Sequence, residues 1–299
     1  MKKIGTRGSH LARWQADWVQ ARLAEHGVPT EIVIIKTRGD AEVDRPLHEM
    51  EGKGFFTKEI EDALLNGRID IAVHSLKDLP TALPPGLKLG PVPARHDPRD
   101  ALVNGESLNA LPSGTRLGTS SLRRVAQVRY LRPDLEVVPL RGNVPTRVKK
   151  VEQRQGLDAA LLAIAGLERL GLGSKATPID PLEVMPAPGQ GALGIELRAD
   201  DTSTEKAVQP LHDAVSATAV IAERTLLAAL GGGCQAPVAA WVGNGERGTG
   251  SRLYGRVMER NGAVELTASI GIDPTRPERA GEQVARLLEA EGAATLLAR

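Results

Sequence analysis

Apolar and amphipathic stretches alternate along the first part of the chain, in the order strand, helix, strand, helix, strand. Residues 3–6 and 69–73 are predicted to be short strands, and 31–35 is an apolar β-branched run, typical of a strand buried on both faces. Between them, over 9–27 and 57–67, apolar positions recur at helical spacing, and each stretch ends at a glycine. Strands that alternate with helices predict an α/β fold built on open sheets.

A second region with the same alternation follows a proline-rich segment over 80–98, which marks a boundary near residue 95. In this region we expect strands at 116–118, 136–140 and 159–163 and helices from about Ser120 and Asn143. Prolines recur over 178–188, and Pro188 to Ala192 is interpreted as a hinge. The remaining chain predicts a strand at 194–197, one long helix over 204–230, strands at 238–242, 253–258 and 264–272, and a helix over 277–291.

Composition narrows the function classes. Lysine and arginine number 38 against 37 acids, a net charge of +1, so no global field favours nucleic acid or an anionic membrane. Aromatic residues make up only 2% of the chain, which disfavours binding of single-stranded nucleic acid through base stacking. The chain contains no run of about 18 apolar residues, so no membrane-spanning helix is predicted. The single cysteine favours a reducing compartment, hence the cytoplasm, and the scattered histidines predict no metal site.

Arginines follow several of the predicted strands, close to where the next helix begins. They are Arg7, Arg123, Arg124, Arg141 and Arg147. Strand-to-helix junctions line the ligand crevice of open α/β sheets, and helix N-termini favour anions there. The pattern predicts a ligand with several carboxylates, although phosphate is equally compatible at this point. Any one of these arginines could equally be a solvated ion-pair partner.

A polar segment, His74 to Pro80, ends the strand at 69–73. Ser75, Lys77 and Asp78 are expected at the carboxyl end of the sheet, where a carboxylate beside basic groups stays ionised and can accept a proton. The competing interpretation is a structural turn or a helix cap at Asp78. His74 is interpreted as a packed strand residue.

Cys234 stands in the run Gly231-Gly232-Gly233-Cys234-Gln235, where the glycines suggest a close approach by a ligand. It is a candidate covalent attachment point, and the alternative is an inert buried thiol. Gly52-Lys53-Gly54 lacks the earlier glycine and the Ser or Thr of a nucleotide loop, so we interpret it as a lid that carries one lysine.

Taken together, six motifs resemble the porphobilinogen deaminase, or hydroxymethylbilane synthase, family, in order from residue 4 to about 240. They are Arg7-Gly8-Ser9 with Trp14-Gln15, His74-Ser75-Leu76-Lys77-Asp78-Leu79-Pro80, Gly118-Thr119-Ser120-Ser121-Leu122-Arg123-Arg124, Leu140-Arg141-Gly142-Asn143-Val144, Pro188-Gly189-Gln190-Gly191 and Gly232-Gly233-Cys234-Gln235. Each motif alone is weak, and their shared order makes the resemblance specific.

The resemblance implies a transferase that condenses four porphobilinogen molecules head to tail, with release of ammonia, into the linear tetrapyrrole hydroxymethylbilane. It implies one dipyrromethane cofactor per chain, joined by a thioether to Cys234. Because every pyrrole of this chemistry bears an acetate and a propionate, the resemblance favours carboxylate over phosphate as the partner of the arginines.

The family's catalytic aspartate falls on Asp78. The resemblance places cofactor contacts at Ser75, Lys77, Asp78, Thr119, Ser120, Ser121, Arg123, Arg124, Arg141 and Gly142. It places substrate contacts at Arg7, Ser9, Gln15, Lys53, Phe56, Arg141, Arg147, Arg169 and Gln190. One departure is Glu49, where many relatives carry a second lysine.

The implied fold has two domains like those of type II periplasmic binding proteins, around a hinged cleft, and a smaller α/β domain. We expect a discontinuous first domain of residues 1–94 and 190–208, a second of 95–189 and a third of 209–299, in a cytoplasmic monomer. Two other hypotheses are a non-enzymatic anion-binding protein and a thiol hydrolase. The second would need a histidine base near Cys234, and no histidine follows it in the chain.

Overall fold

The computed structural model describes residues 1–37, 57–232, 236–244 and 250–298. Contacts divide the chain into two compact units. Unit one combines Met1–His96 with Gly191–Ala217, and unit two combines Asp97–Gln190 with Thr218–Arg299. The chain therefore leaves unit one, builds part of unit two, and returns at residue 191. The expected division into three domains stays a prediction.

Unit one contains a five-stranded sheet in the order β2-β1-β3-β10-β4. Its strands are β1 (Lys2–Thr6), β2 (Thr30–Ile34), β3 (Ile71–Ser75), β4 (Leu87–Leu89) and β10 (Leu193–Arg198). Its helices are α1 (His10–Glu25), α3 (Lys58–Leu65) and α7 (Thr202–Val208), with short 3-10 turns η2 (Leu76–Asp78) and η4 (Gln209–Leu211). Strands β2, β1 and β3 are parallel, and β10 runs antiparallel between β3 and β4.

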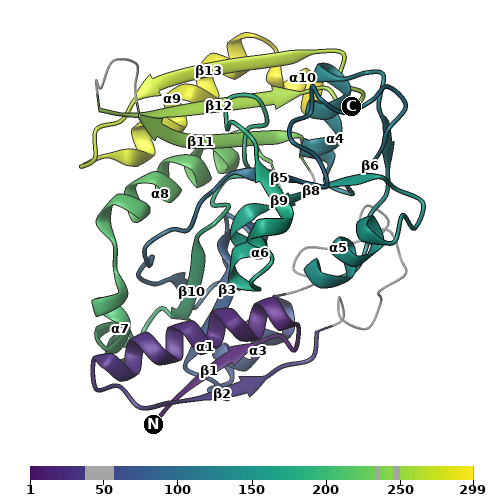
Figure 1. The fold of residues 1–299 in the computed structure, drawn as a ribbon. Coiled ribbons are helices and arrows are strands. Elements are labelled where there is room, and N and C mark those ends of the chain that lie inside the picture. Colours follow the sequence, from purple (N-terminus) through teal and green to yellow (C-terminus); the bar gives the residue numbers. More distant parts are fainter. Residues whose placement is uncertain (38–56, 233–235, 245–249, 299) are drawn as a thin grey trace. The chain divides into compact units, whose positions relative to one another are not determined.

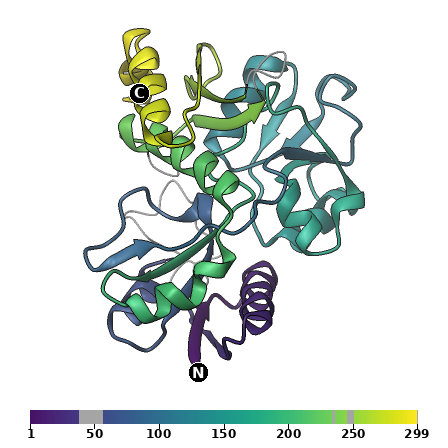
Figure 2. The same ribbon diagram turned by 90° about the vertical axis from the view of Figure 1, so that its left-hand side faces the viewer.

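The inner strands β3 and β10 are buried along almost their whole length, as expected for strands covered on both faces. The expectation that 31–35 is buried on both faces is wrong, because β2 is an edge strand whose residues are only partly buried and whose Ile34 is exposed. Val19 and Leu23 of α1 pack with Ile71 on one face, and Figure 1 and Figure 2 both show α1 against the strands. On the other face, Leu64 of α3 packs with Ala72. The α/β prediction is confirmed for this unit.

Unit two contains a second five-stranded sheet, in the order β7-β6-β8-β5-β9. Its strands are β5 (Asp100–Val103), β6 (Arg116–Gly118), β7 (Glu136–Val138), β8 (Ala159–Ala163) and β9 (Ala176–Pro178). Its helices are α4 (Leu122–Leu131), α5 (Val144–Glu152) and α6 (Ile164–Arg169), with the short turn η3 (Gly173–Lys175). Strands β7, β6 and β8 are parallel, so their carboxyl ends share one edge.

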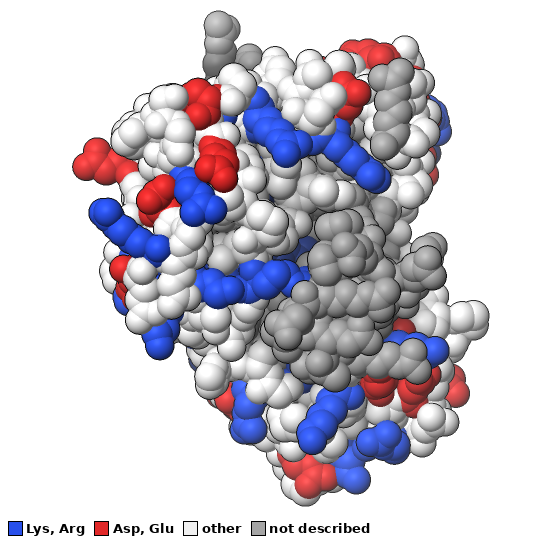
Figure 3. All heavy atoms as spheres, turned by 90° about the vertical axis from the view of Figure 1, so that its right-hand side faces the viewer, with Lys and Arg blue, Asp and Glu red and all other residues white. Residues whose placement is uncertain are grey.

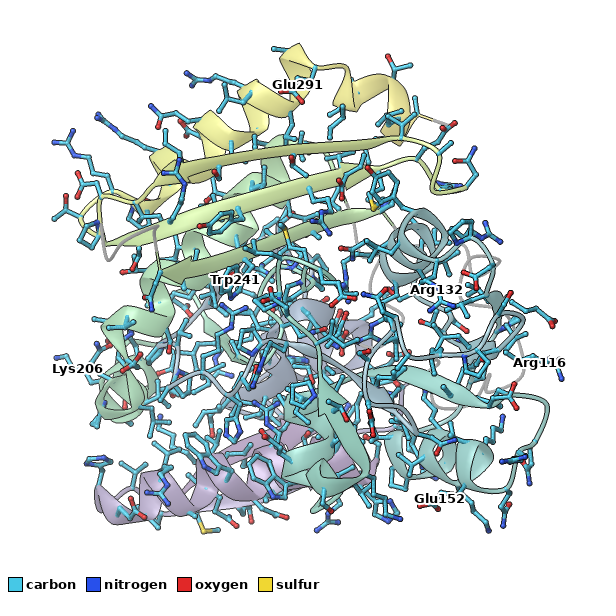
Figure 4. All side chains as sticks on the ribbon, turned by 45° about the horizontal axis from the view of Figure 1, so that its top comes forward. Arg116, Arg132, Glu152, Lys206, Trp241 and Glu291 are labelled. Atoms are coloured by element: carbon cyan, nitrogen blue, oxygen red, sulfur yellow. The ribbon has the colours of Figure 1, made fainter. Side chains whose placement is uncertain are left out.

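The C-terminal part of unit two is a three-stranded antiparallel sheet of β11 (Val238–Asn244), β12 (Ser251–Met258) and β13 (Glu265–Gly271). Helices α8 (Ala214–Ala229), α9 (Pro277–Ala290) and α10 (Ala293–Leu297) accompany it. Leu226 and Val284 pack with Val257 on the helix side. On the other side, Trp241 stacks on Tyr254 with ring centroids 5.4 Å apart, and Figure 4 shows Trp241 on this sheet.

The prediction of one long helix over 204–230 is wrong. Helix α7 ends at Val208, and Pro210 stands in the turn that follows, where its missing N–H cannot continue a helical ladder. Asp213 then accepts a 2.7 Å hydrogen bond from the Ser216 amide and starts α8 as a new helix. The break was missed because the sequences of α7 and α8 both have alanine-rich helical spacing.

The described ranges contain no helix that is long and apolar enough to cross a membrane, and no group of three potential metal-ligating side chains. Basic and acidic side chains are interspersed on the face of Figure 3, in keeping with a net charge of +1.

Candidate active site

The expected catalytic segment lies at the carboxyl edge of the sheet in unit one. Strands β1 and β3 are parallel neighbours with Gly5 opposite Ala72, so Arg7, which follows β1, and Ser75, which ends β3, both lie at that edge. The chain then turns through η2, which leaves Lys77 half-buried and Asp78 exposed. An exposed carboxylate at a sheet edge is accessible to a ligand.

On the side of α1, a side-chain hydrogen bond holds the end of β3. Gln15 is almost fully buried, and its Nε2 donates a 2.8 Å hydrogen bond to Ser75 Oγ. Ser9 caps α1 by accepting from the Ala12 amide at 3.3 Å. Two expected site residues, Gln15 and Ser75, are thus joined directly.

The opposite side of β3 carries a buried titratable cluster. His74 Nε2 lies 3.2 Å from Glu196 Oε2, and both side chains are buried, so the interpretation of His74 as a packed residue is confirmed. Burial raises the pKa of nearby Glu61 above its ordinary value, and the Glu196 carboxylate acts in the same direction. Strand β3 is therefore fixed from both faces just before it reaches Asp78.

In unit two, two strand-to-helix junctions lie side by side. Strands β6 and β7 are parallel with Gly118 opposite Val138. The Ser120 hydroxyl donates to the Leu140 carbonyl and accepts from the Leu140 amide, both at 3.0 Å, and so cross-links the junctions. The Thr119 to Ser121 segment and the Arg141-Gly142 pair consequently occupy one edge.

The second junction has a strained backbone that needs glycine. Gly142 has φ +110°, and a Cβ there would lie 2.9 Å from the Thr146 side chain. Asn143 caps α5 by accepting from the Thr146 amide at 2.9 Å. Arg147 Nε donates a 2.7 Å hydrogen bond to the Gly142 carbonyl, which fixes Arg147 beside Arg141.

Arg123 and Arg124 are buried and share one carboxylate. Asp100, which is fully buried, lies 2.8 Å from Arg123 Nη2 and 2.7 Å from Arg124 Nη2. Burial alone would raise the pKa of Asp100, but the two guanidinium groups hold it well below the ordinary value. Among the residues that the structure describes, two buried guanidinium groups against one carboxylate leave excess positive charge in this cluster.

Two further expected site residues are also buried in unit two. Gln190 Nε2 donates to Asp100 Oδ1 and to the Pro98 carbonyl, both at 2.7 Å, so Gln190 belongs to the Asp100 cluster. Arg169 ends α6, and burial lowers its pKa to about 10.

Family sequence models cover nearly the whole chain. The model described as the dipyromethane cofactor binding domain of porphobilinogen deaminase matches residues 3–206, and the model of that family's C-terminal domain matches residues 217–290. The chain belongs to the porphobilinogen deaminase family.

Full-length relatives agree with this assignment. The chain is 48% identical to the porphobilinogen deaminase of Syntrophotalea carbinolica over 99% of its own length and 95% of that protein. The values for the Moorella thermoacetica porphobilinogen deaminase are the same, and the Nitratidesulfovibrio vulgaris protein is 46% identical over 100% of this chain and 97% of that one.

Similarity to solved structures is weaker. An ancestral cationic amino acid solute binding protein matches with a TM-score of 0.43 and 14% identity, over 70% of this chain and 87% of that chain. The apo form of YehZ matches with a TM-score of 0.42 and 14% identity, over 71% and 85% of the two chains.

As a porphobilinogen deaminase family member, the chain is a transferase of tetrapyrrole synthesis. It condenses porphobilinogen into hydroxymethylbilane with a dipyrromethane primer. The described residues fit such a group, because Arg123 and Arg124 share one carboxylate and a pyrrole carboxylate would balance the second positive charge. Among the described residues Arg123 donates two hydrogen bonds, which leaves part of its five-donor fork for a ligand.

Sequence reasoning missed Asp100, the acceptor that organises both arginines. A signal was present, because this acid opens the apolar strand over 101–103 and would be buried without a partner unless a cation faced it. Lys53, Phe56, Glu49 and Cys234 lie outside the described residues.

Proposed function

We propose that Cys234 carries the dipyrromethane as a thioether and that Asp78 is the catalytic carboxylate. The arrangement of Asp78 supports its role: it is an exposed carboxylate at a sheet edge whose strand is fixed from both faces. The bound dipyrromethane supplies the primer to which pyrroles are added. Asp78 contacts pyrrole N–H groups and stabilises the positive charge that develops on porphobilinogen as ammonia leaves.

The arginines and hydroxyl groups at the strand ends hold pyrrole carboxylates. We assign cofactor contacts to the Thr119 to Ser121 segment, to Arg123, Arg124, Arg141 and Gly142, and to Ser75 and Lys77. We assign substrate contacts to Arg7, Ser9, Gln15, Lys53, Phe56, Arg141, Arg147, Arg169 and Gln190. The excess positive charge around Asp100 carries this proposal, because a buried cation without an anion is costly.

The finer architecture belongs to the same proposal. We place three domains at 1–94 with 190–208, 95–189 and 209–299, in a monomer that works in the cytoplasm. The single cysteine supports a reducing compartment.

Intact-protein mass measurement tests the tether. Wild-type protein should exceed the mass of its sequence by one dipyrromethane, and Cys234→Ser should not, because serine is a much poorer nucleophile than a thiolate. An unmodified mass for the active wild-type enzyme would refute the tether.

Steady-state kinetics test Asp78. Asp78→Asn should lower kcat by about 100-fold or more while the cofactor stays attached, the size typical of a lost charged catalytic group. Asp62→Asn, at an exposed acid on α3, is the matched control and should retain turnover. Equal kcat in the two variants would remove Asp78 from the mechanism.

A further inference from the structure

Arg256 is a buried arginine of the C-terminal sheet that contacts elements outside it. It lies on β12 and is 8% exposed. Its Nη1 donates to Gln127 Oε1 at 2.7 Å and to the Glu183 carbonyl at 3.0 Å, and its Nη2 donates to the Leu182 carbonyl at 2.7 Å. Glu265 on β13 lies 2.8 Å from Nε and balances the charge. One guanidinium therefore connects β12 and β13 with α4 and the 182–183 segment.

Gln127 of α4 links Arg256 to Met185 and to Arg123 through hydrogen bonds. Its Oε1 accepts from Arg256 and, at 2.7 Å, from the Met185 amide. Its Nε2 donates to the Met185 carbonyl at 3.1 Å and to the Arg123 carbonyl at 3.4 Å. Because two N–H donors reach the same amide oxygen, the Gln127 side chain has only one satisfactory orientation.

The connection ends at the arginine pair. The Met185 carbonyl also accepts from Arg123 Nη1, and Arg123 binds Asp100. Arg256, Gln127, Met185, Arg123 and Asp100 thus form a continuous buried polar chain inside unit two. Figure 1 shows α4 beside the end of the C-terminal sheet, and α4 contacts β12.

The segment over 182–190 is held by the C-terminal part at two more points. The Ala240 amide of β11 donates to the Pro186 carbonyl at 3.1 Å. Glu223 of α8 accepts from the Gly189 amide at 2.8 Å and from the Val242 amide at 2.9 Å. This segment is therefore a strap between the C-terminal part and the Asp100 cluster.

We propose that Arg256 is a positioning residue for the cofactor site. It fixes the C-terminal part, in whose sequence Cys234 lies, against the helix that carries Arg123 and Arg124. This inference rests on the proposed function, in which Cys234 tethers the dipyrromethane and the arginine pair binds its carboxylates. Cys234 and the arginine pair can bind one cofactor only if the distance between them is fixed. The buried network fixes the C-terminal sheet against the helix that carries the arginines, and so limits how that distance can vary.

Arg252 offers a matched control. It lies four residues earlier on β12 and on the same face, since side chains alternate along a strand. Its Nε donates to Ser269 Oγ on β13 at 3.0 Å, so among the described residues its hydrogen bonds stay within the sheet. Arg256→Gln and Arg252→Gln remove the same charge from the same strand.

The test compares these two variants in the full-length enzyme. Arg256→Gln should raise KM for porphobilinogen, or lower the fraction of protein that carries the cofactor, by about tenfold, as expected when a group that orients a binding residue is lost. Arg252→Gln should stay within about twofold of wild type in both. Equal values for the two variants would overturn the proposal.

Three measurements separate positioning from general destabilisation. Amide hydrogen exchange should rise in 122–131 and 182–190 for Arg256→Gln and not for Arg252→Gln. Gln127→Leu should reproduce the KM effect, and the double variant should add little, because both side chains act through one path. Additive effects would overturn the proposal. If Arg256→Gln does not fold, Arg256→Lys and Gln127→Leu decide the same question.

Failure of the proposed function gives a different result. If wild-type protein carries no covalent cofactor, the tether is wrong whatever Arg256 does. If wild type is loaded and Arg256→Gln matches it in loading, KM and exchange, only the positioning role is wrong.

Discussion

At the scale of single residues, Asp100 is the side chain on which the cofactor-binding edge depends. Its two oxygens face Arg123, Arg124 and Gln190, so one carboxylate orients three side chains of the site. It needs no contact with substrate to do so. A residue of this kind determines where donors point while the donors bind the ligand.

Asp100→Asn should therefore destabilise the protein strongly. It leaves two buried guanidinium groups without a counter-charge, a change that typically costs about 3–5 kcal/mol. Chemical denaturation at pH 7 measures the loss. The control is Asp97→Asn, which breaks a partly exposed pair with Arg99 and should cost at most about 1 kcal/mol.

The pH dependence of this effect has a definite sign. Because the pKa of Asp100 is lowered in the folded state, its contribution is complete above the ordinary aspartate pKa of about 3.9 and declines only as the pH falls further. The stability difference between wild type and Asp100→Asn should thus be constant from pH 5 to 8. A difference that shrinks within that range would contradict the buried ion pairs.

The contribution of Glu61 to stability should change with pH in the opposite direction. Its raised pKa means that the folded state binds the proton more tightly, so wild-type stability falls as the pH rises through the ordinary glutamate pKa toward the folded value. Glu61→Gln removes this cost and should raise the denaturation midpoint at pH 7 while leaving it nearly unchanged at pH 4. Asp17→Asn, at an exposed acid on α1, should show no such difference.

At the scale of elements, the N-terminus of α5 combines a helix cap with a binding edge. Asn143→Ala should cost about 1 kcal/mol of stability through the lost cap. It should also raise KM for porphobilinogen, because losing the cap loosens the first turn of α5, whose Gly142 and Asn143 carbonyls hold Arg147. Unfolding curves and steady-state kinetics measure the two effects.

Serine at the same position separates the cap from the amide side chain. Asn143→Ser keeps an N-cap acceptor and should restore most of the stability and the KM. If serine fails where asparagine succeeds, the side chain acts beyond capping.

The elements also show how far sequence reasoning extends. The helical spacing of apolar residues and the glycine after each stretch predicted α1 and α3 well. These helices bury one face, and neighbouring residues in the sequence determine where they begin and end. The break between α7 and α8 depends on Pro210 and the Asp213 cap, two signals that the alanine-rich periodicity outweighed. Strand β5 was missed, because its role as neighbour of β8 comes from pairing across about sixty residues.

The candidate site was predictable only in part, for the same reason. Residues at or just after strand ends, such as Ser75 and Arg141, could be assigned to an edge from sequence. Their supports could not, since Asp100, Gln127 and Arg256 reach the site through contacts that no periodicity encodes.

At the scale of the whole molecule, each unit has its own hydrophobic core. Leu23 is fully buried in unit one and Leu117 in unit two. Leu23→Ala and Leu117→Ala should each cost about 2–5 kcal/mol and should shift different parts of the thermal transition. Scanning calorimetry measures this. A single transition moved equally by both variants would show that the units unfold together.

The position of β10 has a consequence for how the protein is made. This strand occupies an inner place between β3 and β4, yet it follows them by about a hundred residues. A ribosome that adds about 5–20 residues per second therefore leaves the nascent sheet without its inner strand for several seconds. During that interval β3 is an unprotected edge, and the emerging chain depends on chaperones or on rapid completion of residues 97–190 to avoid pairing with a neighbour.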